Sequence, residues 1–323
     1  MTFQVVLNQD RDITDLIEKL SLTDSMDQVA YSAELTLIVT EDLQKTGIHN
    51  GQTIQVFVQE SDSTTQTEVI HGVIWHIEST KRATKRLEIT VYDLSKYLTE
   101  SEEEYLFTSG QTANQRLKEY ANDWNIPLWK VPDTQISLAK SNIAVKKLSS
   151  WIQSDLHETA NKGGKLYRVR MWPKGLELFE LGSNEVVWEI NEDIFEEIKQ
   201  TRTLNNIATK VKVLGKSQDK QSSPVLAVEE GETNKYGTLQ KIIQDSNMTT
   251  ATEAKKAAQA KLSGYQENFS AVTVDIHSIR AGDLVHINNL DLIVTFVRHE
   301  LGNPGRMEIK MGSNEYVKRR YFT

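Results

Sequence analysis

The chain of 323 residues contains no cysteine. Disulfide bonds, thiol catalysis and thiolate metal sites are therefore excluded, and the composition fits a protein made in the cytosol. No apolar run approaches the roughly 18–20 residues that an α-helix needs to span a bilayer. The first residues, Met1 to Gln4, lack the basic and apolar regions of a secretory signal. We therefore expect neither membrane insertion nor a cleaved signal.

The sequence also lacks the motifs of common catalytic sites. It contains no G-x-S-x-G nucleophile elbow, no phosphate-binding loop and no G-x-G-x-x-G fingerprint. Its carboxylate clusters, such as Glu102–Glu104, do not indicate the two opposed carboxyl groups of a glycosidase, which lie roughly 5–10 Å apart. The separations between the histidines in the sequence do not match those of known metal sites. The histidines are His49, His71, His76, His157, His277, His286 and His299. We expect no catalytic, cofactor-binding or metal-binding residues.

The net charge is mildly acidic, −8 at pH 7. A general nucleic-acid binder needs clustered Lys and Arg to neutralise phosphates, so this charge argues against that function. The cluster Lys318–Arg320 is the one candidate for such contacts, and a solvated or partner-facing tail is the better interpretation. We expect no sequence-specific nucleic-acid binding.

The pattern of apolar and polar residues changes twice along the chain, which divides it into three segments. Residues 1–97 are predicted to form a β-domain, because short apolar runs alternate with polar turns. One predicted strand places Ile54, Val56 and Val58 on one face. Residues 12–20 are ambiguous, since their apolar residues have helical spacing in β surroundings. Five or six short strands favour a small barrel or sandwich.

Residues 98–195 are predicted to form an α+β module of two helices followed by three strands. The first helix starts at the capping box Thr112–Gln115, where a hydroxyl and a side-chain amide satisfy free N–H groups. The second helix is predicted to stop at Gly163–Gly164, because glycine tolerates the left-handed conformation that closes helices. The strands are predicted to form a meander over residues 167–190.

Residues 196–323 are predicted to return to β-structure. Residues 207–214 alternate as a half-buried strand does, and the polar segment 215–237 is predicted to be a long mobile loop. Thr250–Glu253 is a second capping-box pattern. It opens an alanine-rich helix predicted over residues 250–262.

Two stretches at opposite ends of the chain resemble each other in the same register. In each, one apolar piece is followed by another that starts fourteen positions later: 73–77 and 87–91 in the first, 293–297 and 307–311 in the second. A glycine-containing piece lies upstream of each, at Gly51 and at Gly282. Identities are few, so duplication of one β-unit and accidental likeness between hairpins both remain open.

The order of the short sequence pieces carries a resemblance along most of the chain. The pieces are Asp12–Asp15, Ala30–Ala33, Gly72–Ile74, Ile89–Leu94, Tyr105–Phe107, Gly164–Tyr167, Asn206–Gly215, Ala254–Leu262, Gly282–Val285, Val297–His299 and Met307–Ile309. In this order they resemble the baseplate hub proteins of contractile phage tails and phage-derived bacteriocins, of the XkdQ/YqbQ type and akin to the late-control gene D protein.

The resemblance implies a mainly β chain in which two related small β-barrel domains, residues 1–97 and 196–323, flank the central module, residues 98–195. It implies a structural baseplate hub that forms a homotrimeric ring with pseudo-six-fold symmetry. Such a ring adapts a hexameric tail tube to a trimeric spike. The implied partners are two further copies, the tail tube, spike and tape measure proteins and other baseplate proteins. The implied location is the baseplate of a virion or tail-like particle, assembled in the bacterial host cytoplasm.

Tryptophans suggest the main alternative. The central module contains Trp124, Trp129, Trp151 and Trp172 close together in sequence. Core packing is their usual role, but a platform for carbohydrate is the other interpretation. The chain would then be a tail-tip module that contacts cell-wall glycan. A tail-associated peptidoglycan hydrolase is the least favoured alternative.

Overall fold

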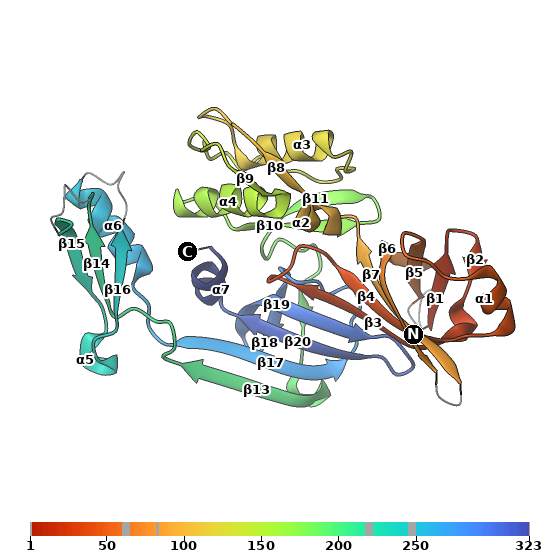
Figure 1. Cartoon of the computed structure of the whole chain (residues 1–323). Helices are drawn as coiled ribbons and strands as arrows, with labels where there is room; N and C mark the ends of the chain where they lie inside the picture. The colour runs from red at the N-terminus through yellow and green to blue at the C-terminus, as the bar shows by residue number, and fades with distance from the viewer. Residues whose placement is uncertain (1, 60–64, 82–83, 217–221, 245–249, 323) are drawn as a thin grey trace. The chain divides into compact units, whose positions relative to one another are not determined.

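The structure, a computed structural model, describes residues 2–59, 65–81, 84–216, 222–244 and 250–322 (Figure 1). The fold is mainly β, as predicted. The chain divides into a larger compact unit, Met1–Ile198 with Ser270–Phe322, and a smaller compact unit, Lys199–Phe269. The larger unit thus combines residues from all three predicted domains.

One sheet of thirteen strands brings the two ends of the chain together. Its main path is β13-β17-β20-β19-β3-β4-β7-β6-β5-β1-β2, and β18 pairs with both β19 and β12. The strands are β1 (Thr2–Leu7), β2 (Arg11–Asp12), β3 (Ile17–Ser25), β4 (Ser32–Ile38), β5 (Thr53–Gln59), β6 (Gln66–Lys81), β7 (Lys85–Asp93), β12 (Trp188–Glu189), β13 (Phe195–Thr203), β17 (Gln266–Val274), β18 (Leu284–Ile287), β19 (Leu290–Glu300) and β20 (Arg306–Gly312). The boundary between the compact units falls within β13 and β17.

Alternating apolar residues build the core of the N-terminal strands. Ile54, Val56 and Val58 of β5 are all buried, as predicted, because a strand turns successive side chains to opposite faces. They belong to one hydrophobic core with apolar residues of other strands of the sheet, among them Leu22 and Ile89.

Short helices precede or follow strands of the thirteen-stranded sheet in the chain. They are the 3-10 helices η1 (Thr14–Leu16) and η2 (Glu192–Ile194) and the α-helices α1 (Glu41–Thr46) and α7 (Asn314–Tyr321). The ambiguous residues 12–20 therefore form a single 3-10 turn that leads into β3. Helix α7 begins where the Ser313 hydroxyl accepts a hydrogen bond from the Tyr316 N–H, which satisfies a free donor at the helix start.

The central segment contributes two packed helices and a hairpin to the larger unit. The elements are α2 (Lys96–Glu100), β8 (Glu102–Glu104), α3 (Ala113–Asp123), β9 (Val145–Lys147), α4 (Leu148–Asn161), β10 (Tyr167–Trp172) and β11 (Gly175–Glu180). The predicted capping box at Thr112 and Gln115 is present, and α4 is followed by Gly163 with a φ of 89°. Residues of both helices and of β10 and β11 share one hydrophobic core, which includes Leu117, Ile152 and Val169.

The prediction of a three-stranded meander in this segment is wrong. Strands β10 and β11 pair with each other as a hairpin, whereas β12 runs parallel to β18 and places Trp188 opposite Val285. The side-chain amide of Asn184 explains the change of partner. It accepts a hydrogen bond from the Leu284 N–H at 2.7 Å and donates one to the Leu284 carbonyl at 3.0 Å, so the chain is held against β18.

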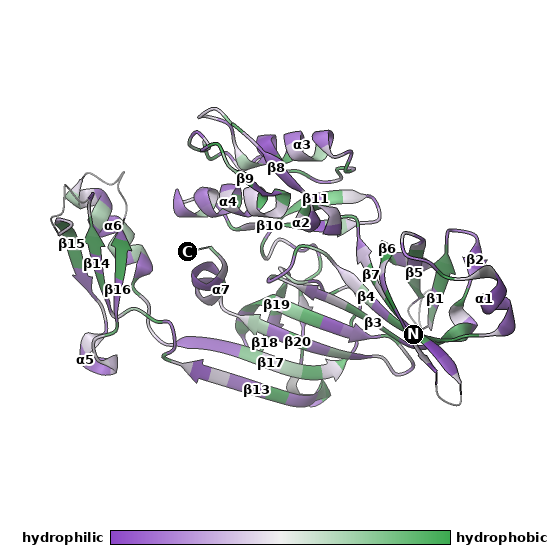
Figure 2. Cartoon of the chain, in the orientation of Figure 1, coloured by the Kyte–Doolittle hydropathy of each residue, from purple (hydrophilic) through white to green (hydrophobic). Residues whose placement is uncertain are grey.

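The smaller unit is a three-stranded sheet with one helix on it. Strands β14 (Lys210–Leu214), β15 (Val225–Glu230) and β16 (Gln240–Gln244) pair in the order β15-β14-β16, and helices α5 (Thr233–Tyr236) and α6 (Ala251–Lys261) accompany them. Ala254 and Ala258 of α6 are buried with Val211 and Val213 of β14, whose hydrophobic residues stand out in Figure 2. The alanine-rich helix is confirmed, and Thr250 caps it by accepting the Glu253 N–H.

The prediction of a long mobile loop over residues 215–237 is wrong for its described part, which contains β15 and α5. Residues 217–221 of that segment lie outside the described residues. No side chain of β15 is fully buried, and the strand pairs with β14 through its backbone. Among the helices that the structure describes, none combines the length and the hydrophobicity needed to cross a membrane.

Candidate functional site: a repeated strand unit

The two stretches that resemble each other in sequence fold in the same way. We call β3, β4, β5, β6 and β7 the N-repeat, and β13, β17, β18, β19 and β20 the C-repeat. The pairing orders are β3-β4-β7-β6-β5 and β13-β17-β20-β19-β18, so each strand has a counterpart in the same position. A short helix follows each repeat, α2 after β7 and α7 after β20.

The register of the central hairpins is identical. In the N-repeat Ile74 lies opposite Val91, and in the C-repeat Val294 lies opposite Met311. The ladder then skips one residue in both β6 and β19, since His76 and Phe296 are the next residues to find partners. A bulge of this kind bends the strand and is a fixed feature of a fold.

The glycine pieces upstream make the same contacts. In the N-repeat, the Gly51 N–H donates to the Ile74 carbonyl at 2.9 Å, and the Ile74 N–H donates to the carbonyl of the residue after the glycine at 2.8 Å. In the C-repeat, the Gly282 N–H donates to the Val294 carbonyl at 2.7 Å, and the Val294 N–H donates to the carbonyl of the following residue at 2.8 Å. The two glycines have φ of 88° and 96°, a conformation that favours glycine.

This agreement favours duplication over accidental likeness. Hydrophobic alternation alone selects strands, but it does not select a bulge at one position or a left-handed glycine at another. The repeats share strand order, register, bulge and glycine turn although few of their side chains are identical. The chain therefore contains nearly the same backbone arrangement twice.

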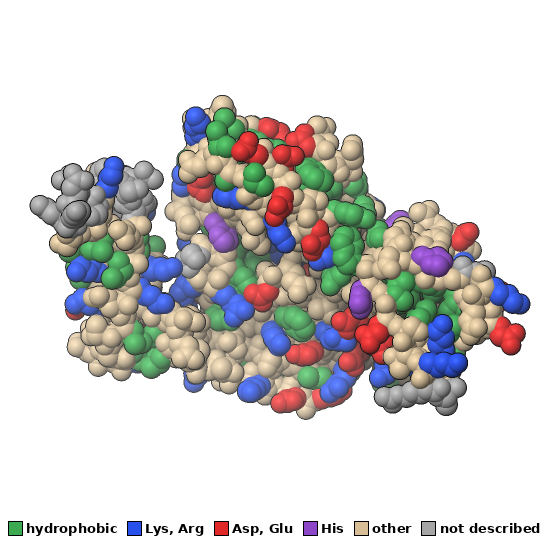
Figure 3. All heavy atoms as spheres, viewed as in Figure 1, with side chains coloured by type: hydrophobic (Ala, Val, Ile, Leu, Met, Phe, Trp, Pro, Cys, Tyr) green, Lys and Arg blue, Asp and Glu red, His purple; other side chains and the backbone are tan. Residues whose placement is uncertain are grey.

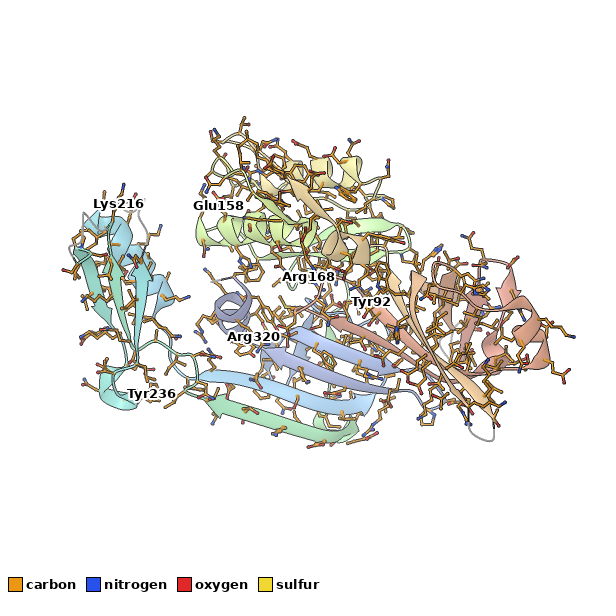
Figure 4. The ribbon with its side chains drawn as sticks, viewed as in Figure 1. Tyr92, Glu158, Arg168, Lys216, Tyr236 and Arg320 are labelled. Carbon is orange, nitrogen blue, oxygen red and sulfur yellow. The ribbon has the colours of Figure 1, made fainter. Side chains whose placement is uncertain are left out.

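A buried charge cluster joins the repeats to the β10–β11 hairpin. It contains three arginines and three acids: Arg168, Arg170, Arg280, Asp24, Glu177 and Asp283. Asp24 of β3 accepts hydrogen bonds from Arg168 at 3.0 Å and from Arg280 at 2.6 Å. Figure 4 shows Arg168 between its own hairpin and the strands of the large sheet.

The second half of the cluster lies around Arg170. Its guanidinium contacts Asp283 at 2.7 Å and Glu177 at 3.1 Å, and the indole N–H of Trp172 donates to Glu177 at 2.7 Å. Opposite charges in equal number limit the cost of removing these groups from water.

Burial and charge oppose each other in setting the pKa values of this region. Burial would raise the pKa of the Asp24 carboxyl, but Arg168 and Arg280 outweigh burial and hold it at about 2. Burial raises the pKa of Asp283, which Arg170 offsets only in part. The nearby Asp93 has its pKa raised to about 6 by burial, although its oxygens accept hydrogen bonds from Ser95 and from the Tyr31 N–H. Asp24 is therefore ionised at neutral pH, and its contacts with Arg168 and Arg280 tie three chain segments together.

Among the described residues, the histidines and glutamates considered above do not form a metal site, and two of them have clear structural contacts. Within the described part of the chain, no group of three or more His, Asp or Glu residues has the arrangement of a metal site. His299 is fully buried, contacting Asp275 at 2.6 Å and the Ile279 carbonyl at 2.9 Å. Glu103 belongs to the short ladder of β8 with β9, opposite Lys146. These contacts assign structural roles to His299 and Glu103.

The four tryptophans do not form one platform. Trp151 is buried in the core of the central helices and donates its indole N–H to the Glu103 carbonyl, and Trp124 packs at the edge of that core. Trp129 and Trp172 meet edge to face with ring centroids 5.8 Å apart. This pair lines a groove together with Trp188, which sequence reasoning did not include.

The comparisons with known proteins agree with this geometry. The model of the YQBQ-like family matches residues 20–310. The chain belongs to the YQBQ-like family. No curated protein matches this YQBQ-like chain.

Solved phage tail proteins share the fold of the YQBQ-like chain at low sequence identity. The tail protein of Neisseria meningitidis MC58 is 13% identical with a TM-score of 0.70, and 99% of each chain is covered. The 43 kDa tail protein of prophage MuSo2 from Shewanella oneidensis is 12% identical with a TM-score of 0.71, over 97% of this chain and 98% of that one. The E. coli c3393 protein, described as a type VI secretion component similar to the T4 tail proteins gp27 and gp5, is 7% identical with a TM-score of 0.54, over 98% and 78%. The predicted family is confirmed, and the likeness to these structures shows the fold.

Proposed function

We propose that this YQBQ-like protein is the structural hub of a phage-tail or tail-like baseplate. Three copies form a ring that carries six similar strand units, and the ring seats a hexameric tail tube on a trimeric spike. The observation that carries the proposal is the duplicated strand unit, with one register and one bulge in both repeats.

Symmetry is the physical reason for a duplicated unit. A ring of three identical single faces cannot match a six-fold tube end, because the number of equivalent contacts differs. Two similar units in each chain supply six nearly equivalent positions while the assembly keeps three-fold symmetry. The same ring then offers three-fold contacts to a spike.

The charge distribution suits a structural part of a tail better than a DNA-binding protein. Acidic and basic side chains are interspersed on the face seen in Figure 3. The C-terminal cluster Lys318–Arg320 lies in α7, where Arg320 contacts Asp27 at 3.2 Å. Arg320 therefore makes a contact within this chain.

Besides the tube and the spike, the proposed hub would contact the tape measure protein and other baseplate proteins.

The mass of the assembly tests this proposal. We expect the chain to have the mass of three copies by light scattering. When its tube and spike proteins are added, we expect it to bridge them in a pull-down. A chain that stays monomeric in the presence of both partners contradicts the hub. A peptidoglycan zymogram is expected to show no cleared band.

The groove beside Trp129 and Trp172 supports a second, weaker candidate, contact with cell-wall glycan. Trp129 is 37% exposed and has an aromatic ring of the kind that stacks on sugars, and the Lys130 ammonium lies over that ring, 4.5 Å from its centroid. The indole N–H of Trp172 already donates a hydrogen bond to Glu177 and is not available to a sugar. A glycan pull-down distinguishes this candidate, because Trp129→Ala should abolish retention while the exposed Leu106→Ala should not. Absence of retention with the unmodified chain eliminates it.

A further inference from the structure

The two repeats differ in how one strand edge is covered. In the C-repeat, β18 pairs with the first part of β19, from Leu290 to Ile293. Strand β3 then pairs with the second part of the same edge, from Phe296 to Glu300, while β20 occupies the opposite edge. Strands β18 and β3 together thus cover this edge of β19 nearly from end to end.

The counterpart edge in the N-repeat is only half covered. Strand β5 pairs with β6 from Gln66 to Val73, and β7 occupies the opposite edge as far as Lys81. Among the described strands, none pairs with the stretch His76–Thr80 on the β5 side. This stretch is the counterpart of the residues in β19 that β3 covers. An unpaired row of backbone N–H and carbonyl groups is a template for another strand.

The C-repeat supplies the strand that fits this edge. Strand β3 is preceded by η1, and β13 is preceded by η2. The two 3-10 helices both have three residues and the two strands both have nine. Strand β3 lies between β4 and β19, but β13 ends the path of the sheet, and β17 is its one neighbour among the described strands. Its side chains are mostly exposed, including Ile198 at 40%.

We propose that β13 of one copy pairs antiparallel with residues 76–80 of β6 in a second copy of this chain. The junction repeats between chains the contact that β3 makes with β19 within a chain. The inference rests on the proposed hub and specifies how its ring closes. Around the ring, the β3–β19 junction within each chain alternates with the β13–β6 junction between chains. The contact between chains joins two different surfaces and is therefore head-to-tail, and three copies contain six junctions in all.

The intrachain contact fixes the register. Thr23 lies opposite Arg298, and the guanidinium of Arg298 reaches the Ser21 hydroxyl, two residues along the same face, at 3.0 Å. Aligning β13 on β3 places Thr201 opposite Glu78 and puts Lys199 in the position of Ser21. Glu78 of one copy then faces Lys199 of the next, and opposite charges on one face stabilise a strand pair.

Engineered disulfides test the register directly, because the chain has no cysteine of its own. The test variant is Glu78→Cys with Thr201→Cys in the full-length chain. On oxidation we expect covalent species of two and three chains and none larger, all reverting to single chains on reduction. Facing residues of paired strands lie within the Cα separation that a disulfide needs, roughly 4.4–6.8 Å.

Two matched variants control this experiment. Thr23→Cys with Arg298→Cys should oxidise within one chain and leave the mass unchanged, since these residues already face each other. Glu78→Cys with Gln200→Cys places the thiols on opposite faces and should yield on the order of tenfold less covalent trimer. As an independent measurement, Glu78→Lys should weaken the trimer, and Lys199→Glu in the same chain should restore it.

Light scattering on the unoxidised samples separates the possible failures. A trimer in which the test pair does not oxidise, although the intrachain control does, overturns the strand pairing and leaves the hub standing. A monomer without cross-links overturns both. Covalent ladders longer than three chains support the strand contact but contradict a closed ring of three.

Discussion

The N-repeat and the C-repeat share a backbone and differ in what surrounds it. Gly51 and Gly282 have the same left-handed conformation and the same hydrogen bonds, but a side chain added at Gly51 would meet nothing within 4 Å, whereas one at Gly282 would lie 2.9 Å from Arg168. Likewise, Asp24 of β3 is fully buried, while its counterpart in β13, Arg202, is exposed. Strand register has been kept, and the side chains have adapted to different neighbours.

The largest expected effect distinguishes the counterparts Asp24 and Arg202. Asp24→Ala leaves Arg168 and Arg280 buried without their anion, so the free energy of unfolding should fall by about 3–5 kcal/mol. Arg202→Ala removes an exposed ion pair with Glu267 and should cost less than about 1 kcal/mol. Denaturant unfolding measures both. Equal losses would show that burial does not separate the two positions.

A second prediction concerns pH and two counterparts, Asp93 at the end of β7 and Ser313 directly after β20. Burial raises the pKa of Asp93 from 3.8 to about 6, so the folded protein binds a proton that the unfolded chain releases. This contribution to stability is complete below pH 3.8 and is lost as the pH rises through 6, by about 3 kcal/mol for a shift of this size.

Asp93→Asn should therefore flatten the fall of stability between pH 4 and 6, measured by denaturant unfolding at several pH values. The fall should not vanish, because burial also raises the pKa of Asp155 and Asp283. Ser313→Ala is the matched variant and should leave the slope unchanged. An Asp93→Asn profile parallel to the wild type refutes the assignment.

The glycine counterparts give a smaller difference. Gly282→Ala combines an unfavourable φ with a clash against Arg168, and we expect a loss of about 2–3 kcal/mol. Gly51→Ala meets the unfavourable φ alone and should cost about 1 kcal/mol. Thermal unfolding of both variants in parallel shows whether the surroundings or the conformation dominates.

The smallest effect is expected at the start of α7. Ser313→Ala removes the hydroxyl that accepts the Tyr316 N–H and should lower the free energy of unfolding by about 1 kcal/mol. Ser313→Asp keeps an acceptor there and serves as the control, with stability expected near that of the wild type. A loss as large in Ser313→Asp as in Ser313→Ala would indicate that packing, rather than capping, holds this helix.

Local signals in the sequence were sufficient for several parts of the fold. Capping boxes located the starts of α3 and α6, because Thr112 and Thr250 satisfy backbone donors a few residues away. The alternation of Ile54, Val56 and Val58 identified β5 and its buried face. The spacing within the two similar stretches indicated the repeated unit, because register depends on spacing as well as on side-chain type.

Contacts between distant segments could not be predicted in the same way. The pairing of β3 with β19 joins Asp24 to Val297, and no local pattern marks that partnership. The charge cluster was missed because Arg168 and Arg170 look like ordinary outward-facing residues of a strand until the large sheet covers them. Strand β12 was assigned to the wrong sheet because its partner depends on the amide of Asn184.

The contact between β3 and β19 has a consequence during synthesis. Ser21 and Arg298, which touch in the finished protein, are 277 positions apart. At about 5–20 residues per second, a ribosome needs roughly 15–55 s to make the second after the first. During that interval the edge of β3 that later pairs with β19 has no partner in the nascent chain. On a polysome, neighbouring copies of the chain lie close enough to reach that edge. Translation speed and chaperone occupancy thus become determinants of whether each polypeptide pairs with itself or with its neighbour.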